Sequence, residues 1–65
     1  MEQSEPILRF FKFEHLPAHL QERSRPFADL ATRLVETLPR NAERSVALRK
    51  LLEAKDAAVR AVLPE

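Results

Sequence analysis

The longest uninterrupted run of good helix formers in this chain is SVALRKLLEAKDAAVR, residues 45–60. On a helical projection it carries an apolar stripe whose members recur at spacings of three, four and seven residues. These members are Leu48, Leu51, Leu52, Val59 and Val62, with Lys55 among them. A second stripe of small residues, which let another helix approach closely, contains Ala47, Ala54, Ala57, Ala58 and Ala61. Because one helix carries two packing stripes, we predict that it has two neighbours.

A second helical pattern precedes this run. It begins near Pro17, whose missing N–H costs nothing in the first turn of a helix. Its apolar stripe, at helical spacing, contains Phe27, Leu30, Ala31, Leu34, Val35 and Leu38. Pro26 lacks a hydrogen-bond donor, so we expect a kink or a break near Ser24 and Arg25, with Ser24 capping the restarted segment. Pro39 is expected to end this helix.

The connection between the two helical patterns is short. Asn41 is a suitable N-cap, and Glu43 lies in the first turn, where the helix dipole favours an acid. A loop of this length requires the two helices to run antiparallel, and Pro64 is expected to end the second one. We therefore predict an all-α fold, in which a kinked helix and a long helix form an antiparallel hairpin at residues 14–64, after an N-terminal arm at residues 1–13.

The arm contains ILRFFKF, residues 7–13, with three of the four phenylalanines of the chain. It is either a short extended strand or an irregular segment, and residues 1–6 are interpreted as a mobile terminus. An exposed arm of this composition would aggregate, so we expect it to pack on another subunit. A chain of 65 residues without cysteine buries little surface alone and has no disulfides. We therefore predict a homo-oligomer.

The composition also bounds the partners and the compartment. Net charge is only +1, whereas a duplex-binding domain usually carries a larger basic excess, so a local anionic ligand is favoured over a long polyanion. No apolar run approaches the roughly 20 residues that span a bilayer. Glu2 and Glu5 stand where a secretory signal would be basic. We expect a cytoplasmic protein with no membrane partner.

Groups for enzyme chemistry are scarce. Cysteine, tyrosine and glycine are absent, and Ser24 and Ser45 are explained as residues at helix starts. His15 and His19 have the spacing of metal ligands on a helix, but Pro17 between them marks the expected helix start. We therefore expect no catalytic residue, no metal, no cofactor and no enzymatic activity.

Residues suited to binding a ligand are more numerous than residues suited to catalysis. Phe11, Phe13 and His15 offer flat faces, and Arg9, Lys12 and Arg25 are cations close to them in the sequence. A nucleobase stacked on an aromatic ring gains about 1–3 kcal/mol, and guanidinium groups bind phosphate bidentately. Arg60 stands near the end of the apolar stripes, so it is expected to point into an interface or pocket, where Asp56 or a ligand phosphate would neutralise it. The alternative for the phenylalanines is that they form the core of an oligomer.

Three segments resemble a known family. VALRKLLE at residues 46–53 and DAAVRAV at residues 56–62 resemble the C-terminal helix of the small phage proteins that sponge cyclic nucleotides, the anti-CBASS sponge family and its helical-hairpin relatives. The aromatic-Glu-x-Leu entry FEHL, residues 13–16, is also similar, and the likeness covers about residues 11–64. It implies a dimer or hexamer that sequesters cyclic di- or trinucleotides made by bacterial immune cyclases, without catalysis.

The resemblance also implies roles for particular residues. Phe13 matches the aromatic residue that stacks on a base, although the family usually has tyrosine there. Arg25 lies near a phosphate-contacting lysine of the family, with a slip of one residue around Pro26, and Arg60 matches an arginine at the end of the last helix. The predicted ligand-binding residues are therefore Phe13, Arg25 and Arg60, with Phe11 as a second stacking ring.

Two other functions fit the pattern. A ribbon-helix-helix DNA-binding repressor has the same strand-helix-helix order and is the one alternative with a nucleic-acid partner. Arg9 and Lys12 would then lie on opposite faces of the strand, so they could not both read the major groove. The second alternative is a plain protein-interaction helical hairpin.

Overall fold

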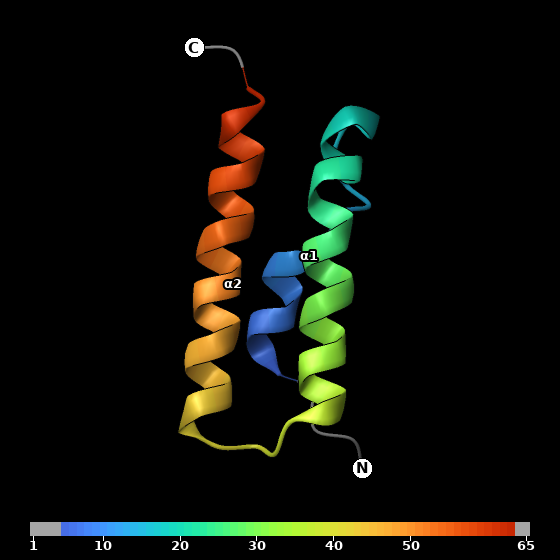
Figure 1. Ribbon diagram of the computed structural model, residues 1–65. Helices are drawn as coiled ribbons and strands as arrows, with labels where there is room; N and C mark the ends of the chain where they lie inside the picture. The colour runs from blue at the N-terminus through green and yellow to red at the C-terminus, as the bar shows by residue number, and fades with distance from the viewer. Residues whose placement is uncertain (1–4, 64–65) are drawn as a thin grey trace.

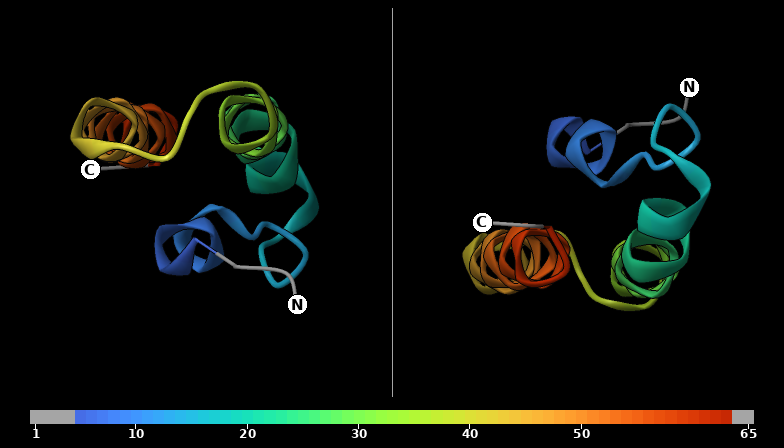
Figure 2. Two further views of the ribbon diagram at one scale, coloured as in Figure 1. Left: turned by 90° about the horizontal axis from the view of Figure 1, so that it is seen from below. Right: turned by 90° about the horizontal axis from the view of Figure 1, so that it is seen from above.

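The computed structural model describes residues 5–63, which form three helices. They are a 3-10 helix, η1 (Pro6–Phe11), and two α-helices, α1 (Ala18–Thr37) and α2 (Ala42–Ala61). The two α-helices lie side by side in opposite directions (Figure 1), and η1 lies on one face of the hairpin that they form (Figure 2). The predicted all-α hairpin is confirmed. Residues 1–4 of the expected mobile terminus and the expected stop at Pro64 lie outside the described residues. For residues 5 and 6 the expectation is wrong, because Glu5 pairs with Arg44 and Pro6 begins η1.

The ends of the α-helices follow their local signals. Asn41 caps α2, because its Oδ1 accepts a hydrogen bond of 2.9 Å from the backbone N–H of Arg44. Glu43 lies in the first turn, as expected. Pro17 is the N-cap residue of α1, and the helix ends at Thr37, two residues before Pro39.

The chain stays helical through Pro26, so the alternative of a break near Ser24 and Arg25 is wrong. Ser24 is not a cap; it lies fully buried inside α1, and its Oγ has no hydrogen-bond partner. A proline inside a helix costs about 3 kcal/mol or more. Leu20 before Pro26 and Ala31 after it are both buried, so apolar packing on either side offsets that cost.

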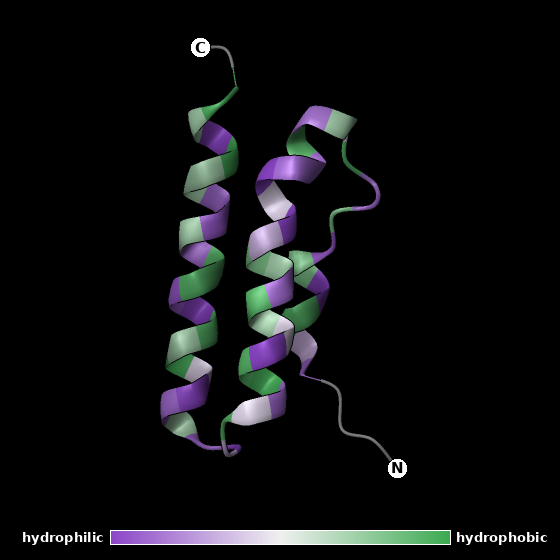
Figure 3. Ribbon diagram, turned by 45° about the vertical axis from the view of Figure 1, so that its right-hand side comes forward, coloured by the Kyte–Doolittle hydropathy of each residue, from purple (hydrophilic) through white to green (hydrophobic). Residues whose placement is uncertain are grey.

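The core takes one fully buried side chain from each helix: Phe11 of η1, Ala31 of α1 and Leu48 of α2. Around them pack partly buried side chains of all three helices, namely Ile7, Leu8, Phe27, Ala28, Leu34, Val35, Leu51 and Leu52. Figure 3 shows hydrophobic and hydrophilic positions interspersed along each of the three helices. The arm is thus neither strand nor irregular over Pro6–Phe11, and it packs on the hairpin of its own chain. The turn that Pro6 begins brings Ile7, Leu8 and Phe11 to one side, which this chain can bury itself.

Arg44 joins the three helical segments from inside. Its side chain is 7% exposed; Nη1 donates to the carbonyl oxygens of Val35 at 3.0 Å and Leu38 at 3.2 Å, and Nη2 donates to the carboxylate of Glu5. Carbonyls in the last turn of a helix lack partners within that helix, and Arg44 supplies donors to two of them. Neither Arg44 nor its pairing with Glu5 was predicted from the sequence.

The two stripes of α2 have different surroundings. Leu48 is fully buried, and Leu51, Leu52 and Val59 are partly buried. Ala54, Ala57 and Ala61 of the alanine stripe are exposed, and no other segment of residues 5–63 covers the hairpin face opposite η1 (Figure 2). Val62 of the apolar stripe is exposed, and Ala47 and Ala58 of the alanine stripe are half-buried. Within one chain, α2 therefore has two neighbours, α1 and η1, and the exposed part of its alanine stripe is left uncovered.

Candidate functional site

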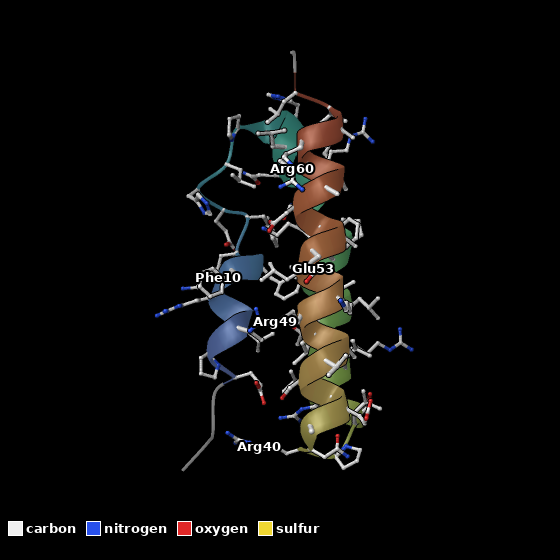
Figure 4. All side chains as sticks on the ribbon, turned by 90° about the vertical axis from the view of Figure 1, so that its left-hand side faces the viewer. Phe10, Arg40, Arg49, Glu53 and Arg60 are labelled. Atoms are coloured by element: carbon white, nitrogen blue, oxygen red, sulfur yellow. The ribbon has the colours of Figure 1, made fainter. Side chains whose placement is uncertain are left out.

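Two grooves adjoin between η1 and α2, and both are lined by Phe10. We call them the basic groove and the apolar groove. The basic groove, of about 330 Å³, is lined by four Lys or Arg residues and one histidine: Arg9, Lys12, Lys55, Arg60 and His15. The apolar groove, of about 520 Å³, has a floor of Pro6, Ile7, Phe10, Val46 and Leu52. Figure 4 looks onto this side of the molecule, where Phe10 lies on η1, Arg49 lies between η1 and α2, and Arg60 lies nearer the end of α2.

The basic groove has an excess of positive charge. Its one acid, Asp56, pairs with Lys55 through an Nζ to Oδ1 distance of 2.9 Å. Three cations therefore remain without an acid partner in the groove, and they belong to Arg9, Lys12 and Arg60. Such a groove attracts an anion with two or three negative charges, since it focuses one sign of charge between walls of low dielectric.

An aromatic ring stands beside these charges. Phe10 is 52% exposed, and the guanidinium of Arg9 lies 5.1 Å from the centre of its ring. A cation at this distance is attracted to the face of the ring. The groove thus combines an accessible ring with cations, which are the groups that hold a planar base and a phosphate.

The four residues predicted as ligand contacts do not meet in one pocket of the chain. Phe13 is half-buried, with the guanidinium of Arg25 5.1 Å above its ring, so these two are brought together. They are apart from Arg60: Phe13 lines a third groove, beside α1, whereas Arg60 lines the basic groove. Arg60 is exposed and Asp56 pairs with Lys55 instead, so the expected pairing of Arg60 with Asp56 is not formed.

Phe11 requires a correction. Its ring is 2% exposed and lies in the core, so it offers no free face to a base. The accessible ring is its neighbour, Phe10, which the sequence analysis did not single out. The signal lay in the spacing of Ile7, Leu8 and Phe11, because one turn of helix that buries these three directs Phe10 outward.

The described residues contain no group of three or more His, Cys, Asp or Glu side chains that could hold a metal ion. Nor does any helix within residues 5–63 have the length and hydropathy needed to cross a membrane. No family model matches the chain, and no curated protein or solved structure is significantly similar to it. The candidate site therefore rests on the geometry and charge of the grooves.

Proposed function

We propose that this protein binds a small phosphorylated ligand with a planar base in the basic groove and does not turn it over. The observation that carries the proposal is the exposed ring of Phe10 at the edge of a groove with three cations unmatched by acids. The base stacks on Phe10, and the phosphates bind Arg60 and Lys12. A cyclic di- or trinucleotide has this chemistry, since it carries two or three phosphates and as many flat bases.

The biological role in this proposal is sequestration, as in the anti-CBASS sponges that the sequence resembles. A phage sponge works in the cytoplasm of the host cell, where it keeps an immune second messenger from its effector. Sequestration depends on affinity, and a Kd of about 1 nM corresponds to about −12 kcal/mol. The guanidinium of Arg25 lies over the ring of Phe13. In this proposal Phe13 is a second ring for stacking, and Arg25 is a further cation for a phosphate.

The binding proposal is tested by calorimetric titration with a panel of cyclic di- and trinucleotides. We expect one species to bind tightly and to be recovered intact after denaturation. Phe10→Ala and Arg60→Ala should each weaken its Kd about 5- to 150-fold, because a stacked base and a charge-assisted phosphate contact are each worth about 1–3 kcal/mol.

Arg33→Ala is the matched control, since Arg33 is exposed on α1 and lines none of the three grooves. It should bind as the unmodified chain does. Equal affinities for all variants would contradict the assignment of the basic groove as the binding site. No binding across the panel would contradict the proposal that the ligand is a cyclic nucleotide.

Homo-oligomeric assembly, as a dimer or a hexamer, belongs to the same proposal. It is supported by the exposed Ala54, Ala57 and Ala61 and by the exposed Leu30 of α1, because small side chains permit close helix contact. A kink of α1 at Pro26 would adapt this helix to a neighbouring subunit.

Ala54→Glu is expected to dissociate the assembly to a monomer of 7.5 kDa, because it places a charge where a second helix must approach. The mass is measured by light scattering. Ala42→Glu, an exposed alanine outside the stripe, is the control and should leave the mass unchanged. An unaltered mass for Ala54→Glu would exclude the alanine stripe as the interface.

A protein-interaction hairpin is the second candidate. It is favoured by the exposure of six large hydrophobic residues, Phe10, Leu30, Leu38, Val46, Val62 and Leu63. The ribbon-helix-helix repressor is not retained, because the segment that would supply its strand contains η1 and residues 5–63 form no strand. A salt-varied duplex DNA titration beside the nucleotide panel checks that exclusion.

A further inference from the structure

The apolar groove has a composition different from that of the basic groove. Its floor is formed by hydrophobic side chains of η1 and of the first half of α2, among them Ile7, Phe10 and Leu52. Its volume of about 520 Å³ lies within the range of sites for small organic ligands, which are lined mainly by apolar side chains and few polar ones.

Three charged side chains line this groove: Glu5, Arg49 and Lys50. Glu5 pairs with Arg44, and Lys50 pairs with Glu53 through an Nζ to Oε1 distance of 3.7 Å. Arg49 also lines the groove and has no ion pair within residues 5–63. Figure 4 shows it between α2 and η1, on the side of Phe10 away from Arg60. The groove therefore offers a hydrophobic floor with the unpaired guanidinium of Arg49 and the exposed ammonium of Lys50, whose pair with Glu53 is open to solvent.

We propose that the apolar groove binds the alkyl chain of a fatty acid, with its carboxylate on Arg49. A carboxylate matches the two parallel donors of a guanidinium, and the ammonium of Lys50 adds a second positive charge to the groove. The alkyl chain lies on Ile7, Val46 and Leu52 and removes their apolar surface from water. This ligand differs in class from the nucleotide proposed for the basic groove, so the two proposals stand separately.

The test is a titration of the full chain with octanoate, decanoate and dodecanoate, all as monomers below micelle formation. We expect saturable binding at one site, with a Kd that tightens about two- to fourfold for each added methylene. The methyl signals of Ile7, Val46 and Leu52 in NMR spectra should shift on titration. Dodecanol, which lacks the charge, should bind at least fivefold more weakly than dodecanoate.

Variants separate the two grooves. Arg49→Ala should weaken dodecanoate at least fivefold and leave dodecanol unchanged, and Val46→Asp should abolish binding of both. Arg60→Ala, which alters only the basic groove, should bind dodecanoate as the unmodified chain does. Phe10→Ala is not informative here, because Phe10 lines both grooves.

Three results would overturn the fatty-acid proposal: a Kd independent of alkyl length, equal losses for Arg49→Ala and Arg60→Ala, or methyl signals that do not move. Sedimentation with phosphatidylglycerol vesicles distinguishes a single bound carboxylate from a lipid surface. The chain should stay in the supernatant, and pelleting without binding of monomeric dodecanoate would contradict the proposal. None of these results bears on the nucleotide titration, which depends on Arg60.

Discussion

Phe11→Ala is expected to lower the free energy of unfolding by about 3–5 kcal/mol, the usual cost of removing a buried phenylalanine ring. The ring is 2% exposed and contacts the core residues contributed by α1 and α2. A domain of this size rarely has more than about 3–5 kcal/mol of stability. The variant should therefore be largely unfolded at room temperature.

Phe10→Ala is the matched control, because it removes the same side chain from the next position. Phe10 is 52% exposed, so its loss should change the free energy of unfolding by less than about 1 kcal/mol. Both variants are compared with the unmodified chain by circular dichroism during urea and thermal unfolding. If Phe11→Ala unfolded at the same midpoint as Phe10→Ala, η1 would not be packed on the hairpin as described.

The hairpin could be predicted because its signals are local. Leu48 and its stripe repeat at helical spacing, and Asn41 followed by Glu43 marks a helix start within three residues. These preferences agree with the tertiary packing, so both α-helices end close to where the sequence places their ends. The antiparallel arrangement then follows from the short loop.

The features that could not be predicted depend on distant contacts. Helix α1 continues through Pro26 because of what Leu20 and Ala31 pack against, which no local window contains. Glu5 and Arg44 are 39 residues apart, and each alone looks like a surface charge. The apolar run of the arm is too short to distinguish strand from helix by periodicity.

The residues of the candidate site also divide into those that a local pattern predicts and those that depend on distant contacts. Arg60 was selected for its place at the end of a helix stripe, and it does line a groove. Lys55 and Asp56 lie beside it because they share the same helix. The proposed site also uses Arg9 and Phe10, whose orientation depends on how η1 packs. Because the sequence leaves the conformation of the arm open, it does not show that Phe11 is buried and Phe10 exposed.

Arg44→Met is expected to destabilise the fold by about 3–5 kcal/mol, although methionine keeps the unbranched apolar stem of arginine. It leaves the carbonyls of Val35 and Leu38 without their donor. It also leaves the Glu5 carboxylate, only 12% exposed, without its cation. An unpaired charge at such a site costs more than the ion pair itself contributes.

Glu5→Gln separates these two effects, because the amide removes the charge and keeps an oxygen that can accept from Arg44. It should cost about 1–2 kcal/mol. The double variant Arg44→Met/Glu5→Gln should be at least about 1 kcal/mol more stable than the sum of the single losses predicts, since no charge is then left unpaired.

Arg33→Met, on the exposed face of α1, should stay within about 0.5 kcal/mol of the unmodified chain. Urea unfolding of all four variants in trimethylamine N-oxide, which stabilises the folded state, gives these free energies. Strict additivity of the two single losses would mean that Arg44 stabilises the hairpin through its carbonyl contacts alone.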